Sequence, residues 1–208
     1  MHRGCAIGYR RLGGFFLAGL VLLCAPHYGS AQQRELLNSE RIDARFGSYG
    51  IEVIAGDDRY RLSNLYSTDR ATGIRTTRTI ALVAWPEQAA AAWASEHRRI
   101  LDGASIGATL QDAGWTVLKI NVRIGSIDAS PGMARLMRIE GAPRLALHLY
   151  ALDLARAEEE LAYARILEIH HPDYLDEAAV RRIYGGDPGD DGASEVDALL
   201  SVLRERGF

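Results

Sequence analysis

Hydrophobic and polar residues alternate in the first third of the chain in a way that predicts strands. The alternation runs over residues 51–55, stops at Gly56 and Asp57, and returns over residues 60–64. Two alternating runs joined by so short a turn predict a β-hairpin. Residues 74–85 form a third run, rich in Thr, Ile and Val, which predicts a third antiparallel strand.

The most regular alternation in the chain lies in residues 118–124. Leu, Ile and Val take the even positions, whereas Lys119, Asn121 and Arg123 take the odd ones. Side chains of a strand point to opposite faces in turn, so this pattern predicts one apolar and one solvated face. A strand with one wet face is typical of an antiparallel sheet.

A second hairpin is predicted further along. Residues 145–149 alternate, and residues 161–170 could pair back with them across a short turn. Good helix formers fill residues 155–164, so a partly helical conformation is the alternative. Residues 125–141 are interpreted as a loop that could hold an edge strand near Leu136.

Apolar residues three and four positions apart predict helices between and after the strands. The predicted helices span residues 39–46, 86–103, 105–114, 174–184 and 194–206. Strands that arrive in groups, with helices between and after them, are typical of α+β proteins. The predicted fold is therefore α+β, with an antiparallel sheet of about five to six strands packed against helices.

The first 31 residues have the pattern of a cleavable signal segment. Three arginines precede an apolar run over residues 15–25, and small residues end the segment at Ala31. The apolar run is too short for a spanning helix, which needs about 20 residues. We expect cleavage after Ala31, a signal peptide over residues 1–31, a single α+β domain over residues 32–208, and no transmembrane segment in the mature chain.

Cysteine usage and the leader together suggest a location. Cys5 and Cys24 both fall within the leader, so the mature chain would contain no thiol. Leu23 occupies the place where a lipoprotein processing site requires a small residue, which argues against a lipid anchor. The sequence therefore predicts a periplasmic or secreted protein without disulfides or zinc–thiolate sites.

Composition and charge bear on the partners. The chain is 48% hydrophobic and 25% charged, which is ordinary for a globular protein and excludes a disordered one. The formal charge is −3; without the leader's three arginines, 21 basic residues remain against 27 acidic ones. A net negative chain is not expected to bind nucleic acid. The partners we expect are a small molecule or an envelope protein, and no cofactor is predicted.

The densest group of chemically active residues is the segment 168–173. Glu168 and His170 would share one face of a strand, with His171 on the other face and Asp173 in the turn that follows. A small secreted hydrolase could use a histidine here as base and a carboxylate to orient it. Too few ligands share a face for a metal site, so none is predicted. Asp173 could instead cap the next helix.

Residues 103–107 match the pattern G-x-S-x-G, with Ser105 at its centre. That pattern marks a hydrolase nucleophile only where a strand turns sharply into a helix, and here a helix is predicted before it. Ser105 is therefore a weak nucleophile candidate, and a helix cap is the simpler interpretation.

A polar sheet face is the main candidate for ligand binding. Alternation places Arg144 and His148 on one side of their strand, and a neighbouring strand would add Lys119 and Arg123. Cations and an imidazole on one face could bind an anionic group. Because no catalytic set is complete, the sequence favours a non-catalytic binding or accessory module of the cell envelope over the hydrolase.

Overall fold

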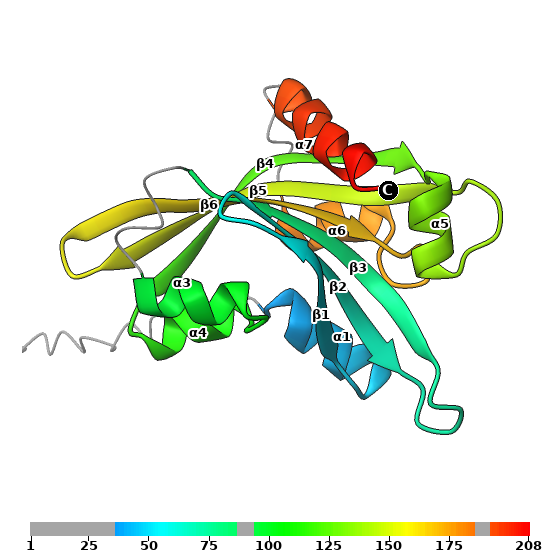
Figure 1. Cartoon of the computed structure of the whole chain (residues 1–208), viewed down its shortest axis with the longest axis horizontal. Helices are drawn as coiled ribbons and strands as arrows, with labels where there is room; N and C mark the ends of the chain where they lie inside the picture. The colour runs from blue at the N-terminus through cyan, green and yellow to red at the C-terminus, as the bar shows by residue number, and fades with distance from the viewer. Residues whose placement is uncertain (1–35, 87–93, 186–191) are drawn as a thin grey trace, which may run out of the picture. The chain divides into compact units, whose positions relative to one another are not determined.

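Six strands pair in an antiparallel sheet with the order β1-β2-β3-β6-β5-β4 (Figure 1). The computed structural model describes residues 36–86, 94–185 and 192–208. The predicted signal segment lies outside these residues. The strands are β1 (Gly50–Gly56), β2 (Tyr60–Thr68), β3 (Arg75–Ala84), β4 (Thr116–Asp128), β5 (Arg144–Arg156) and β6 (Glu159–His170).

Helices cover both faces of this sheet, so the predicted α+β class with an antiparallel sheet is confirmed. The described helices are α1 (Asn38–Phe46), α3 (Ala94–Leu101), α4 (Ile106–Asp112), α5 (Pro131–Met137), α6 (Glu177–Tyr184) and α7 (Ala193–Glu205). Helix α1 ends at Gly47, whose left-handed backbone (φ 71°) glycine adopts without steric cost.

The two faces of the sheet have different cores. On one face, leucines of β3, β5 and β6 pack against α5 and α7. On the other face, α1 and α6 cover one end and α3 and α4 cover the other end (Figure 1). We call the second face the α1/α4 face. It is the face that carries the candidate site.

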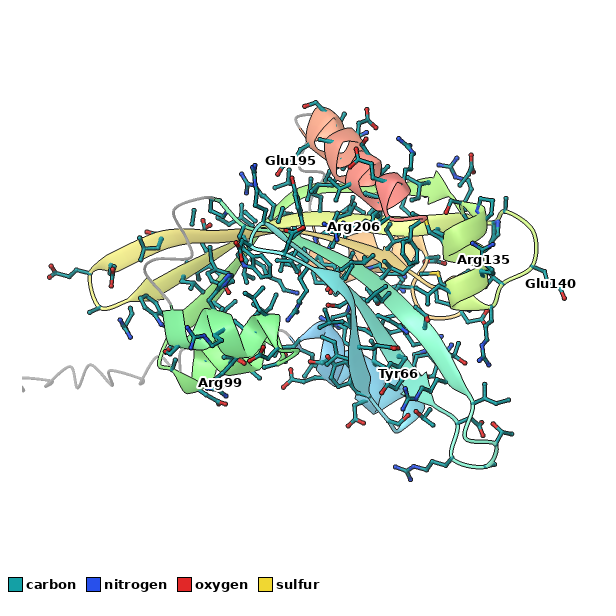
Figure 2. The ribbon with its side chains drawn as sticks, viewed as in Figure 1. Tyr66, Arg99, Arg135, Glu140, Glu195 and Arg206 are labelled. Atoms are coloured by element: carbon teal, nitrogen blue, oxygen red, sulfur yellow. The ribbon has the colours of Figure 1, made fainter. Side chains whose placement is uncertain are left out.

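Two ion pairs hold α7 on its face of the sheet. Glu195 near the start of α7 accepts from Arg165 of β6 at 3.1 Å, and Arg206 just beyond its end donates to Asp57 at 2.6 Å. Figure 2 shows Glu195 and Arg206 at opposite ends of this helix. All four side chains are partly exposed, so these pairs contribute little to the stability of the fold and mainly fix the helix in place.

The predicted second hairpin is confirmed, and its helical alternative is wrong. β5 and β6 pair from Ala146 opposite His170 to Arg156 opposite Glu159, and the turn between them contains Ala157 with a positive φ of 55°. Leu149 lies opposite Leu167, and both are fully buried. Burial of paired apolar residues on both faces outweighs the helix propensity of residues 155–164.

The loop predicted for residues 125–141, with its edge strand near Leu136, is wrong. β4 continues to Asp128, and α5 begins at Pro131, a residue favoured at the first helical position. The hydroxyl of Ser130 accepts from the amide of Met133 at 3.1 Å and caps the helix. Ser130 and Pro131 were thus signals in the sequence for a short helix.

A similar correction concerns α6. This helix begins at Glu177, and its cap is Asp176, whose Oδ1 accepts from the amide of Ala179 at 2.7 Å. Asp173 therefore does not cap it. The carboxylate nearest the first helical turn makes this contact because only it can reach the free amides.

A bulge in β4 changes the face on which Arg123 lies. Asn121 pairs with Tyr150 but Arg123 pairs with Leu149, so Val122 is the extra residue. Directly paired residues share a face, which places Lys119 and Asn121 on the α1/α4 face and Arg123 on the opposite one. The regular alternation predicted for residues 118–124 is therefore broken in its middle.

Candidate functional site

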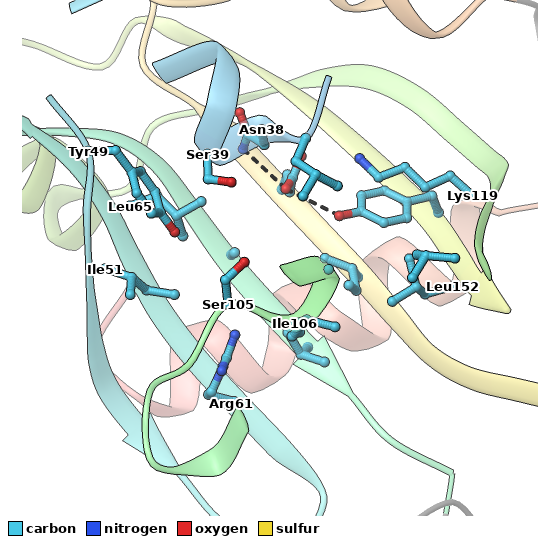
Figure 3. Close-up of a pocket in the computed structure, with 18 residues that line it drawn as sticks. Asn38, Ser39, Tyr49, Ile51, Arg61, Leu65, Ser105, Ile106, Lys119 and Leu152 are labelled. Carbon is cyan, nitrogen blue, oxygen red and sulfur yellow. Dashed lines mark hydrogen bonds between the residues drawn. The ribbon is translucent and has the colours of Figure 1, made fainter. Parts of the chain in front are cut away.

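A cavity of about 80 Å³ lies on the α1/α4 face, between the first residues of α1, the first residues of α4 and the sheet (Figure 3). This volume has room for several waters or part of a small ligand. Its apolar wall consists of Ile51, Leu65, Ala81, Val83, Val117, Leu152 and Ile166. Its polar lining includes Asn38, Ser39, Tyr49, Arg61, Ser105, Lys119, Tyr150 and Glu168.

Glu168 is the buried acid of this cavity. It lies on β6 between β3 and β5, and only 4% of it is exposed. Its Oε1 accepts from Asn38 Nδ2 at 3.1 Å and from the Tyr150 hydroxyl at 3.2 Å (Figure 3). Its Oε2 is buried and has no hydrogen-bond partner among the described residues. One half of the carboxylate is thus satisfied and the other half is not.

Asn38 extends the network away from the cavity. Its Nδ2 also contacts the Thr79 hydroxyl at 3.2 Å, and its Oδ1 accepts from the Tyr174 hydroxyl at 2.7 Å. Thr79 in turn lies 3.0 Å from Nδ1 of His170. These contacts connect α1 to β3, β6 and the segment before α6, so the walls of the cavity are fixed by polar contacts as well as by packing.

His170 is a poor partner for the free oxygen of Glu168. Its Nε2 lies 3.9 Å from Glu168 Oε2, which is beyond hydrogen-bond distance. Complete burial lowers the pKa of His170 to about 4, against an opposing effect of the Glu168 charge. His170 is therefore neutral at pH 7 and supplies no positive charge to this carboxylate.

His148 lies beside Glu168 on β5, and it does not line the cavity. Its Nε2 contacts Asn121 Oδ1 at 2.7 Å, and its ring stacks on Tyr184 with 4.2 Å between the centroids. Burial, and secondarily the charges of His170 and Lys119, lower the pKa of His148 to about 3. A neutral, stacked imidazole of this kind supports the wall and does not bind anions.

Two cationic side chains line the cavity. Lys119 Nζ lies over the rings of Tyr150 and Tyr184, at 4.6 and 5.1 Å from their centroids. Arg61 on β2 is 3% exposed and donates through one terminal nitrogen to the carbonyls of Ile100 and Ala104. The Arg61 Nε has no partner among the described residues. Burial lowers the pKa of Arg61, yet a guanidinium remains charged in a protein.

The structure brings together some of the predicted site residues. Lys119, Glu168 and Ser105 line the cavity, and His148 and His170 lie next to Glu168. Ser105 precedes α4 as its cap residue but makes no side-chain bond to the helix. Figure 3 shows Ser105 and Arg61 among the residues that line the cavity. No hydrogen bond joins Ser105 to a histidine in the described part of the chain, so the hydrolase set is not assembled.

Other predicted site residues lie away from the cavity. Arg144 is exposed and contacts Asp128 and Ser126 at the end of β5, far along the strand from Lys119. His171 is buried under the turn and accepts from the amide of Asp173, whose side chain is exposed. Among residues 36–86, 94–185 and 192–208, no three His, Cys, Asp or Glu side chains gather at a metal-binding distance.

Three important residues are absent from the predicted site. Alternation placed Tyr150 on the polar side of its strand with His148, but Tyr150 was not selected as a site residue. Arg61 stands between apolar residues of β2, which is an unusual place for a cation that must be buried. Asn38 carries no signal in the sequence, because its role depends on a contact with a strand that is 130 residues away.

Comparison with known proteins gives information on the fold. No protein-family description and no curated protein sequence matches this chain. Among solved structures, PhnF from Mycobacterium smegmatis is similar, with a TM-score of 0.50 and 15% identity over 69% of this chain and 67% of that one. This likeness shows a shared fold.

Two further structures are more distant. The ligand-binding domain assigned to a GntR-family transcriptional regulator of Bordetella bronchiseptica has a TM-score of 0.41 and 10% identity, over 61% of this chain and 87% of that one. The C-terminal domain of Yurk from Bacillus subtilis has a TM-score of 0.37 and 10% identity, over 62% and 91%.

These comparisons correct the predicted role and location. The fold shared with PhnF overturns the predictions of an exported envelope module and of a periplasmic or secreted protein. The prediction of location was wrong because it rested only on the basic and apolar pattern at the N-terminus. The secreted hydrolase, which assumes export, is wrong for the same reason, and the comparisons give no support to an envelope protein partner. None of the described helices has the length and apolar character needed to cross a membrane.

Proposed function

We propose that residues 36–208 form a small-molecule-binding domain whose ligand occupies the cavity on the α1/α4 face. The observation that carries this proposal is Glu168, a nearly fully buried carboxylate at the cavity wall with one oxygen unpartnered. An unsatisfied buried charge costs several kcal/mol, so proteins retain such groups mainly where a ligand or a reaction uses them.

The surroundings of Glu168 support binding over catalysis. Pockets for small molecules combine an apolar wall with a few placed polar groups, and this cavity has that composition. No hydrogen bond joins Ser105 to a base among the described residues, and His170 is not part of the cavity lining. The Bordetella bronchiseptica structure is named a ligand-binding domain. The same kind of role is proposed here on the chemistry of the cavity itself.

Thermal melting in the presence of compounds tests this function. Amino acids, organic acids, amines, sugars and sugar phosphates would be added one at a time to the wild-type protein. A Ser105→Trp variant fills the cavity from the start of α4, and Ser201→Trp adds the same bulk at an exposed position on α7, on the opposite face.

We expect at least one compound to raise the Tm of the wild type and of Ser201→Trp, and to leave the Tm of Ser105→Trp unchanged. A compound that stabilises all three proteins equally binds elsewhere and contradicts the proposal. The absence of a shift with every class of compound contradicts it as well.

A further inference from the structure

Three charged side chains line the cavity, and their signs alternate across it. The strand order places the acid, Glu168 on β6, between the two cations, Arg61 on β2 and Lys119 on β4; Figure 3 labels the two cations. Asn38 and Tyr150 occupy only Oε1 of the acid. A ligand in the cavity therefore meets a carboxylate whose Oε2 has no hydrogen-bond partner among the described residues, with cations on either side of it.

Glu168 Oε2 is an acceptor without a donor among the described residues. This oxygen is buried, and Nε2 of His170 is 3.9 Å away. A charged donor gains more from a buried carboxylate than a neutral one does. A protonated amine therefore fits this oxygen best.

Lys119 could bind an acidic group of the ligand. Lys119 lies over two tyrosine rings, and no carboxylate lies within 4.0 Å of its Nζ among the described residues. Contact with ring faces stabilises an ammonium only modestly, so an acidic group that reached it would gain a stronger partner. Tyr150 contacts both Lys119 and Glu168, so the two charges are separated by about one side chain.

Simple ions fit this arrangement poorly. A ligand with only an amine would be repelled by Lys119 and Arg61, and a ligand with only an acid would be repelled by Glu168 and leave its oxygen unpartnered. A molecule with both groups satisfies both sets of charges. The apolar wall, with Ile51 and Leu152 among its members, then covers the rest of the ligand.

We propose that the ligand is a small amphoteric molecule, of the amino acid type, whose protonated amine donates to Glu168 Oε2 and whose acidic group faces Lys119. This inference rests on the proposed function and specifies the chemistry of its ligand. It gives each of three features a role: the carboxylate oxygen and the ammonium, which have no oppositely charged partner in hydrogen-bond distance among the described residues, and the apolar wall.

Calorimetric titration of the wild-type protein with matched compounds tests the inference. Leucine, phenylalanine and serine would each be compared with the acid that lacks the amine and with the amine that lacks the carboxylate. We expect at least one amino acid to bind at least tenfold more tightly than both of its truncated analogues. A truncated analogue that binds as tightly as every amino acid overturns the inference.

Variants of Glu168 and Lys119 test which residue binds the amine of the ligand and which binds its acidic group. Glu168→Gln should weaken binding of the amino acid by about 10- to 100-fold and abolish its advantage over the deaminated acid. Lys119→Met should abolish its advantage over the amine. Glu160→Gln, an exposed position on the same strand, is the control and should change neither ratio. Equal ratios in Glu168→Gln and the wild type overturn the inference.

Failure of this inference and failure of the proposed function give different results. A compound without an amine that raises the Tm in a manner that depends on Ser105 leaves the proposed function in place and overturns the amphoteric ligand. Loss of every Ser105-dependent shift overturns both. Ligand ratios in the wild type do not depend on any variant, so misfolding of one variant leaves the test decisive.

Discussion

Asn38 at the start of α1 and Glu168 near the end of β6 are joined by a hydrogen bond of 3.1 Å across 130 residues of sequence. Both side chains are buried. This contact fixes the first turn of α1 over the centre of the sheet and forms one wall of the cavity. The position of the candidate site therefore depends on a polar contact that only the folded chain can make.

Removal of the Asn38 amide should destabilise the fold. Asn38→Ala removes the donor to Glu168 and Thr79 and the acceptor for Tyr174, and it leaves these buried groups without their partner. We expect the free energy of unfolding to fall by about 2–3 kcal/mol, measured by urea denaturation. Asp43→Ala, an exposed position on the same helix, should change it by less than about 0.5 kcal/mol. Equal effects of the two variants would show that the network does not stabilise the fold.

Two buried histidines should make the folded protein less stable as the pH is lowered. Burial lowers the pKa of His148 to about 3 and of His170 to about 4, whereas both should titrate near 6.5 in the unfolded chain. Below pH 6.5 the unfolded state binds protons that the folded state does not, so stability is lost as the pH falls. Each histidine should contribute a loss of about 2 kcal/mol between pH 7 and pH 5.

Chemical denaturation across this pH range measures the effect. His170→Gln removes one of the two titrating groups, so the free energy of unfolding should depend less steeply on pH than in the wild type. This holds whatever the stability of the variant at pH 7. A slope that His170→Gln leaves unchanged would mean that His170 is protonated in the folded protein.

Arg61 should hold the α3–α4 segment on the sheet. Arg61→Met removes the donor to the carbonyls of Ile100 and Ala104, which join β2 to the loop between these helices. Hydrogen exchange of residues 94–112 should become faster, while exchange in α7 stays the same. Arg59→Met, an exposed arginine before the same strand, should leave both segments unchanged. Unchanged exchange in Arg61→Met would assign the anchoring to the apolar contacts alone.

Gly132 should not tolerate alanine although it lies in a helix. A Cβ at this position of α5 would meet the carbonyl oxygen of Gly207 and lie 2.9 Å from Cα of Phe208. Gly132→Ala should therefore lower the free energy of unfolding by about 1–3 kcal/mol, despite the higher helix propensity of alanine. Gly125→Ala, where the space around a Cβ is open, should be close to neutral. Stabilisation by Gly132→Ala, measured as a higher Tm, would contradict the close contact of α5 with the C-terminal residues.

Local patterns predicted much of the sheet but not its irregularities. Alternation and the content of β-branched residues located the six strands, and the hairpin of β5 and β6 is confirmed even though helix propensity favoured a helix there. The bulge at Val122 could not be read from the pattern, because it is set by pairing with β5. Helix α5 was missed although Ser130 and Pro131 marked its start, because the run of small residues around it was interpreted as a loop.

The candidate site was predictable only in part. Glu168, Lys119 and Ser105 were selected from the sequence for separate reasons, and none of those reasons was a shared cavity. Their meeting point depends on the strand order, which places β6 between β3 and β5, and on the docking of α1 and α4. Charged residues that are distant in sequence are brought together by topology, which a single sequence does not reveal.

The central claim is that a small molecule occupies the cavity beside Glu168. Titration of the isotope-labelled protein with the compound that gives the largest thermal shift, followed by NMR, tests it most directly. We predict that the largest shift changes occur at Glu168, Lys119 and Asn38, with none of similar size in α7. Changes concentrated on the α5 and α7 face, with Glu168 unaffected, would contradict the claim.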